Sequence, residues 1–125
     1  MTSAAEPTMI GLSERAHAKL KRFKEDGIFS EMVDAYRCAI ALALAHGVIP
    51  GEVPAPRTTV FSVASVDPER ELGIAIKAIM NVSDVPVYRM AERLAEWGVE
   101  ELSRRAETGD LDMGLILAEV EALRT

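Results

Sequence analysis

The sequence predicts a mainly α-helical protein of about five helices with one or two short strands. Apolar residues recur at helical spacing through most of the chain, whereas β-branched residues gather in one short segment. Hydrophobic residues make up 49% of the 125 residues and charged residues 27%, which is typical of one folded domain. We expect residues 1–7 to form a flexible tail and residues 8–125 to form a single helical domain.

The segment after the tail predicts a short strand and then a helix. Residues 8–12 alternate briefly, with apolar side chains on one side, which indicates a strand. Ser13 is a suitable N-cap for a helix that stops at Gly27, because its hydroxyl can accept a first-turn N–H. The apolar face of this helix repeats every three or four residues and consists of Ala16, Leu20 and Phe23.

A second helix is predicted from Ser30 to Gly47, and residues 38–45 within it are apolar on every face. Such a helix must be covered all round, and a chain of this length rarely offers so much cover. We therefore expect a homo-oligomer in which small alanines let another helix approach closely. The predicted interface consists of Cys38, Ala41, Leu42 and Ala45.

The rest of the chain predicts a proline-rich connection, a strand and three more helices. Residues 48–57 contain three prolines and form an extended connection, and residues 58–66 are the best strand candidate. Helices are expected to start at Asp67, Asp84 and Asp110, because aspartate is a favoured N-cap. The apolar face expected for the last helix consists of Met113, Leu117, Val120 and Leu123.

The net charge of −6 is confined to the second half of the chain, because residues 1–60 carry equal numbers of acids and bases. This balance excludes a uniformly basic nucleic-acid-binding protein and a polybasic membrane anchor. The first long helix nevertheless carries a local basic stripe, which could face successive phosphates of a DNA backbone or simply be solvated. The basic stripe consists of Arg15, Lys19, Lys21, Arg22 and Lys24.

Residues suited to catalysis are few. The two histidines have no second His or Cys at ligand spacing, and no glycine-rich nucleotide-binding loop is present, so we expect no metal, no cofactor and no enzymatic activity. An enzyme that used Cys38 as nucleophile would require a reactive thiol, whereas a thiol in an apolar helix is usually inert. The first residues lack the pattern of a signal peptide, and the longest apolar run is too short to span a membrane. We expect a cytoplasmic protein without a membrane partner.

The order of elements in residues 8–47 resembles a ribbon-helix-helix unit. Residues 9–13 would be its strand, the helix through Lys24 and the Gly27 turn its middle, and the apolar helix its end. The resemblance implies that two chains pair their short strands and interlock their second helices into one core.

A more specific resemblance rests on four short motifs in a fixed order: Leu12-Ser13, Phe23-Lys24, Gly27-Ile28 and Arg37-Cys38-Ala39. With these motifs, residues 12–46 resemble DndE, the small subunit of bacterial DNA phosphorothioation (sulfur-modification) systems. The resemblance implies a small oligomeric protein without catalytic residues that binds nicked duplex DNA through lysines. The matching basic residues here are Lys19, Lys21, Arg22 and Lys24.

From these observations we expect a non-enzymatic accessory protein of a bacterial DNA modification or defence complex. It would bind the backbone of duplex or nicked DNA non-specifically through the basic stripe and associate with protein subunits of that complex. The alternative is an acidic oligomeric interaction module that does not bind DNA. In that case the helices of the second half would bind a basic partner protein, with Trp97 and Met90 as anchors.

Overall fold

The computed structural model describes residues 6–80, 84–109 and 111–122, and within them the protein is mainly helical with a two-stranded antiparallel sheet. This confirms the predicted fold class. The elements in chain order are β1 (Met9–Ser13), α1 (Glu14–Glu25), α2 (Met32–Ala45), β2 (Arg57–Ser62), α3 (Val63–Val66), α4 (Glu71–Ile79), α5 (Val87–Thr108) and α6 (Met113–Ala122).

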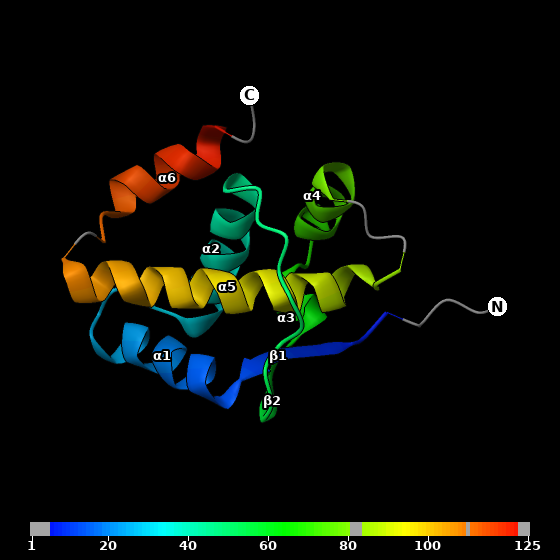
Figure 1. Ribbon diagram of the computed structural model, residues 1–125, viewed down its shortest axis with the longest axis horizontal. Coiled ribbons are helices and arrows are strands. Elements are labelled where there is room, and N and C mark those ends of the chain that lie inside the picture. Colours follow the sequence, from blue (N-terminus) through cyan, green and yellow to red (C-terminus); the bar gives the residue numbers. More distant parts are fainter. Residues whose placement is uncertain (1–5, 81–83, 110, 123–125) are drawn as a thin grey trace.

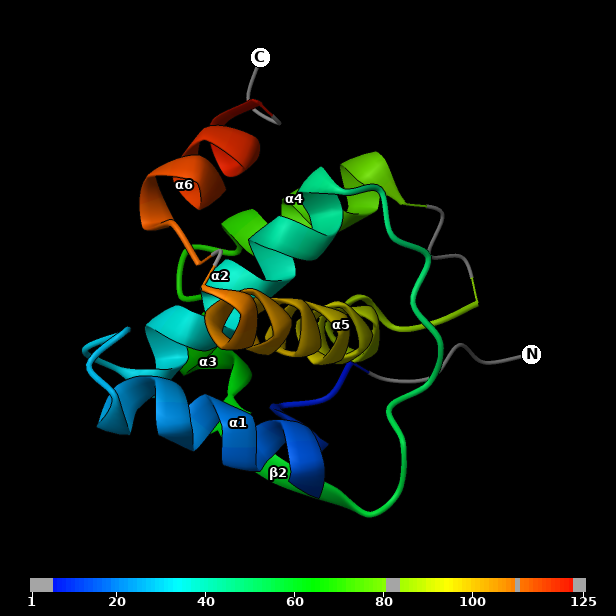
Figure 2. The same cartoon turned by 60° about the vertical axis from the view of Figure 1, so that its left-hand side comes forward.

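The long helix α5 runs through the middle of the molecule and the other elements surround it. Figure 1 shows α1 and the strands on one side of α5, and α4 and α6 on the other. In Figure 2, where α5 is seen more nearly end-on, it is enclosed by its neighbours. Its closest partner is α2, because Gly98 presents no side chain at the crossing. A Cβ built on Gly98 would lie 2.1 Å from the carbonyl oxygen of Ala39.

The predicted first helix is confirmed with its cap. The Ser13 hydroxyl accepts a hydrogen bond from the backbone N–H of Ala16 at 3.1 Å, and α1 begins at Glu14. Gly27 follows α1 with φ of 75°, a left-handed conformation that glycine adopts without strain. The expected apolar face is buried, and its members are Ala16, Leu20 and Phe23.

The strand β1 pairs with β2 of the same chain, and its other edge is also occupied. Glu92 of α5 accepts a hydrogen bond from the Gly11 N–H at 2.7 Å, and Glu96 accepts one from the Ser13 N–H at 3.0 Å. The Tyr36 hydroxyl donates to the Gly11 carbonyl oxygen at 2.9 Å. The strand–helix–helix order of residues 8–47 is therefore present. At Gly11 and Ser13, side chains of α5 and α2 occupy the edge of β1 that strand pairing between chains would require.

Several element boundaries differ from the predictions. The strand expected over residues 58–66 ends at Ser62, whose hydroxyl caps the short helix α3 by accepting the Ser65 N–H at 3.1 Å. Asp67 does not begin a helix directly, because α4 starts only at Glu71. Its carboxylate instead reaches forward and accepts hydrogen bonds from the N–H groups of Leu72 and Gly73.

Other expected caps are replaced as well. Ser30 does not cap α2, which follows Glu31, and Asp84 does not begin α5, which follows Pro86. The N-terminus of α5 is capped from the expected tail: the Glu6 carboxylate accepts the N–H groups of Val87 and Tyr88 at 2.8 and 3.0 Å. Caps supplied from remote parts of the chain leave no local sequence signal.

The face that the last helix turns inward matches the prediction in part, because Met113 and Val120 are half-buried and pack against the core as expected. Ile116 is its buried residue, whereas Leu117 is largely exposed; Asp110 and Leu123 lie outside the described residues. Asp112 caps the helix by accepting the Gly114 N–H at 2.8 Å. The prediction placed Leu117 on this face instead of Ile116 because Leu115, Ile116 and Leu117 are consecutive, so that periodicity alone does not choose among them.

Candidate functional site

An open apolar groove of about 880 Å³ lies between α4 and α6, with α2 as its floor. Figures 1 and 2 both show α4 and α6 on the same side of α5 with α2 beside them. Cys38, Ala41 and Leu44 of α2 line the groove, while Ile79 of α4 and Leu117 of α6 stand on opposite walls. Two small residues, Cys38 and Ala41, on the floor and large apolar residues on the walls give an open apolar hollow of the kind that ligands and partner helices occupy.

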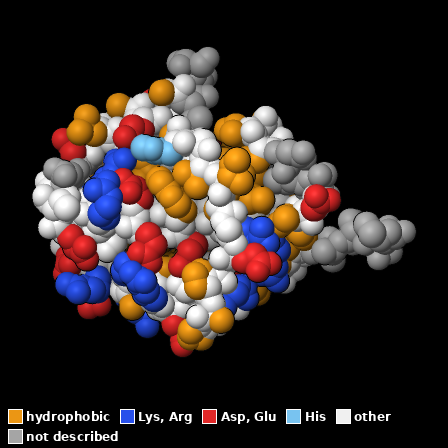
Figure 3. Space-filling model, viewed as in Figure 1, with side chains coloured by type: hydrophobic (Ala, Val, Ile, Leu, Met, Phe, Trp, Pro, Cys, Tyr) orange, Lys and Arg blue, Asp and Glu red, His pale blue; other side chains and the backbone are white. Residues whose placement is uncertain are grey.

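The walls of the groove expose large apolar side chains to solvent. The exposed fraction is 46% for Ile79 and 59% for Leu117, and Figure 3 shows hydrophobic side chains at the surface over α4 and α6. Two further apolar residues on the same helices, Ile74 at 65% and Leu115 at 62%, are exposed but do not line the groove. Adjacent exposed apolar side chains around a hollow are typical of a contact surface.

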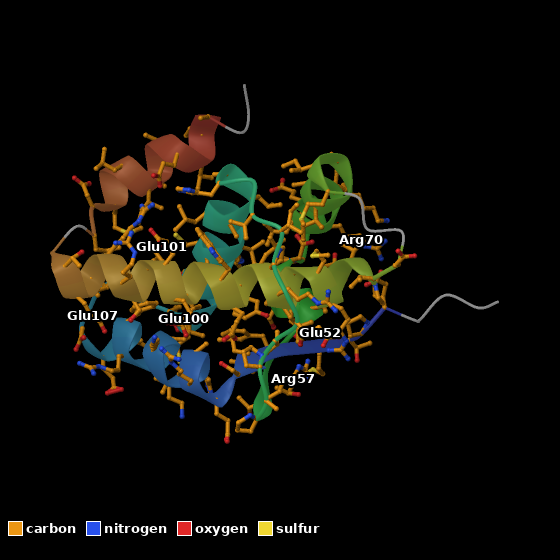
Figure 4. All side chains as sticks on the ribbon, viewed as in Figure 1. Glu52, Arg57, Arg70, Glu100, Glu101 and Glu107 are labelled. Atoms are coloured by element: carbon orange, nitrogen blue, oxygen red, sulfur yellow. The ribbon has the colours of Figure 1, made fainter. Side chains whose placement is uncertain are left out.

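A cluster of charges links α6 to α5, in addition to the buried contact of Ile116. The Arg105 guanidinium donates to Glu101 at 2.9 Å and to Glu119 of α6 at 3.0 Å. Hydrogen bonds from Arg104 and Arg105 lower the pKa of Glu101 to about 2 against the opposing effect of burial. Figure 4 shows Glu101 on the side of α5 that faces α6. The cluster holds one wall of the groove in place.

The charges along the groove are mainly negative. Glu69 and Glu71 line its α4 side and are exposed, and no Lys or Arg lies within ion-pair distance of either among the described residues. Arg37 also lines the groove, but its guanidinium is engaged by Asp34 at 3.1 Å and by the carbonyl oxygens of Ser65 and Val66 at 3.0 and 2.9 Å. The groove is therefore apolar inside and acidic along one edge.

The predicted interface residues fall into two groups. Cys38 and Ala41 are partly exposed and line the groove, and Ala45 is also partly exposed. Leu42 is fully buried inside the chain, so that it has no surface left for a subunit contact. The premise that a single chain cannot cover residues 38–45 is wrong over most of the helix, because α1, α4, α5 and α6 all pack around α2.

The Cys38 thiol is expected to react slowly. Burial raises its pKa to about 11 from an ordinary value of 9.0, with the charge of Arg105 acting in the opposite direction. Because only the thiolate reacts, labelling of the native protein at pH 8 should be about a hundredfold slower than labelling of the denatured chain. Labelling with an iodoacetamide reagent, followed by mass spectrometry, measures the two rates. Equal rates would show that the thiol is accessible and ionised.

The basic stripe does not face solvent as one row. Arg15 and Lys19 both contact Glu100 of α5, at 3.7 Å for Arg15, and Lys24 lies 3.6 Å from Glu31. Figure 4 shows Glu100 on the side of α5 that faces α1, and red and blue side chains are mixed over this region in Figure 3. The remaining members of the stripe, Lys21 and Arg22, are exposed with no carboxylate within ion-pair distance among the described residues.

The two anchors of the alternative prediction are placed differently from each other. Met90 is buried in the core and is not an available anchor. Trp97 is partly exposed and packs beside His46, with ring centroids 5.7 Å apart. Two smaller hollows flank Trp97, and both are lined by Arg15 and Glu100, which already contact each other. The charges around Trp97 are therefore paired with each other, and the groove is the stronger candidate for a binding surface.

The apolar side chains on the groove walls were not predicted from the sequence as a binding surface. The available signal was the excess of apolar residues around the last helix and around residues 72–80, which is the same signal that singled out residues 38–45.

Comparison of the chain with family models, curated proteins and solved structures finds no match. In the described part of the chain, no helix has both the length and the apolarity to cross a membrane, and no group of three metal-binding side chains comes together. A functional assignment rests on the surface itself, and the groove is its most distinctive feature.

Proposed function

We propose that this protein is an interaction module that binds an amphipathic helix of a partner protein in the groove between α4 and α6. The observation that carries the proposal is the open groove of about 880 Å³ with Ile79 and Leu117 exposed on its walls. Burial of each of these half-exposed side chains contributes about 1 kcal/mol to the free energy of binding, which favours association of a partner at this groove.

A helix suits this groove better than an extended peptide. The groove lies between two helices and over a third, so an incoming helix would pack on side-chain ridges as helices do within a bundle. The described edges of β1 are taken by β2 and by α5, so strand addition to β1 is not offered. Ala41 on the floor leaves room for the apolar anchors of the incoming helix at positions i, i+3, i+4 and i+7.

The test uses two pairs of matched variants and a panel of fluorescent synthetic helices with different apolar anchors. Leu117→Asp and Ile79→Asp place a carboxylate in the groove, and each should weaken binding about tenfold or more. Leu115→Asp and Ile74→Asp make the same change on the same helices outside the groove lining, and each should leave the dissociation constant within about twofold. Circular dichroism establishes that all four variants are folded.

Two results would overturn the proposal. One is that no helix of the panel binds, or that the groove variants bind as well as their controls. The other is a stable dimer, seen by sedimentation velocity, that dissociates in Leu117→Asp but not in Leu115→Asp. In that case a second copy of the chain occupies the groove, which is the outcome that the homo-oligomer prediction expects.

A second candidate function, contact with a DNA backbone, is favoured by the exposed pair Lys21 and Arg22. The resemblance to DndE implies the same function within a DNA modification complex. Binding to intact and nicked duplex DNA should fall steeply with salt, and Lys21→Glu with Arg22→Glu should abolish it. Lys77→Glu, an exposed change on α4 across the molecule, is the control. An absence of binding near 50 mM salt would exclude this function.

A further inference from the structure

We infer that the helix bound in the groove carries Lys or Arg along the flank that lies against α4. This inference rests on the proposed function and adds the chemistry of the partner to it. It depends on the charges at the edge of the groove rather than on the apolar walls.

The edge on the α4 side presents two carboxylates that have no Lys or Arg within ion-pair distance in the described chain. Arg70, which lies between them in the sequence, lines a separate hollow beside Tyr88 instead of the groove. Glu69 and Glu71 both line the groove, and both are exposed. The nearby N-terminus of α4 does not offset them, because Asp67 already accepts the N–H groups of Leu72 and Gly73. Arg37 does not offset them either, because its guanidinium is held by Asp34 and by two backbone carbonyl oxygens.

A cationic flank complements this edge, whereas an acidic flank would be repelled by it. Lys and Arg suit the position because their long aliphatic stems cover apolar surface while their charged groups reach the carboxylates. Such charges select among amphipathic helices that share the same apolar face, and they increase the rate of association.

The same edge argues against a second copy as the occupant. The helix α6 of a second copy offers exposed leucines, but the charged residues in its described part are Glu119 and Glu121. The helix α1 is basic, but its apolar face is buried in the core of its own chain. Neither helix combines an available apolar face with a basic flank.

The experiment compares two synthetic helices with one apolar face, one with Lys at the flanking positions and the other with Gln. The wild-type protein should bind the Lys helix about tenfold more tightly at low salt, and the difference should shrink as salt is added. Glu69→Gln with Glu71→Gln should weaken binding of the Lys helix about threefold for each carboxylate and leave binding of the Gln helix within twofold. The control, Glu25→Gln with Glu107→Gln, removes two exposed carboxylates outside the groove and should change neither.

The outcomes separate this inference from the proposed function. Equal binding of the two helices, both weakened by Leu117→Asp and neither changed by Glu69→Gln with Glu71→Gln, would overturn the inference and leave the groove as the binding site. Binding of neither helix would overturn both. Tighter binding of the Lys helix that the control variant reduces as much as the groove variant would assign the effect to net charge and overturn the inference.

Discussion

Replacing Gly98 with alanine should lower the free energy of unfolding by about 3 kcal/mol. The added Cβ would lie 2.1 Å from the carbonyl oxygen and 2.5 Å from the Cα of Ala39, and both of these are backbone atoms that cannot rotate away. The helices α2 and α5 must separate to admit it, and the contact between them is the largest in the core. Alanine favours a helix over glycine by about 1 kcal/mol, which offsets only part of this cost.

Urea denaturation followed by circular dichroism measures the change at Gly98. Gly51→Ala is the matched control, because no atom lies within 4 Å of the Cβ that it would add. That variant should stay within about 0.5 kcal/mol of the wild-type protein. Unchanged stability of Gly98→Ala would mean that α2 and α5 do not cross at this glycine.

Replacing Glu92 with alanine should cost about 3 kcal/mol. Glu92 is 2% exposed, and its carboxylate accepts the Gly11 N–H at 2.7 Å and contacts the guanidinium groups of Arg57 and Arg89, the latter at 3.0 Å. The substitution leaves the Gly11 N–H buried without an acceptor and removes the carboxylate between two arginines. The packing of β1 on α5 depends on this contact, so the loss should appear in the stability of the whole domain.

Glu92→Gln distinguishes the hydrogen bond from the charge. Its amide oxygen can still accept the Gly11 N–H, so about half of the destabilisation should remain. Glu107→Gln, at an exposed position near the end of α5, should leave the stability unchanged. Chemical denaturation of the three variants at pH 7 provides the comparison. Equal stability of Glu92→Ala and the wild-type protein would contradict the role given to this buried cluster.

Local rules were sufficient for much of the fold. The Ser13 cap, the apolar face of α1 and the Gly27 turn depend on residues within a few positions of one another, and the prediction of each is confirmed. The proline-rich stretch after residue 47 is likewise free of helix and strand until β2 begins at Arg57. Where a structural signal was local, it could be read from the sequence.

Boundaries set by remote residues could not be predicted in this way. The N-terminus of α5 is capped by Glu6, which lies 81 positions away along the chain from Val87. The start of α4 depends on a carboxylate that reaches forward five and six residues, beyond the usual range of an N-cap. In both cases the hydrogen bond exists only because packing brings the two segments together.

Some features of the candidate site follow from the sequence, and others follow only from packing. The apolar character of residues 38–45 and the uneven distribution of charge are properties of the sequence, and both contribute to the groove floor and its acidic edge. Which apolar residues stay exposed is set by packing. Leu42 is covered by helices of its own chain while Leu117 is left on the surface, although both belong to apolar segments. Burial of any apolar side chain is favourable in free energy, so hydrophobicity alone does not select which side chains are buried. The arrangement of the helices determines which apolar side chains stay exposed for a partner to cover.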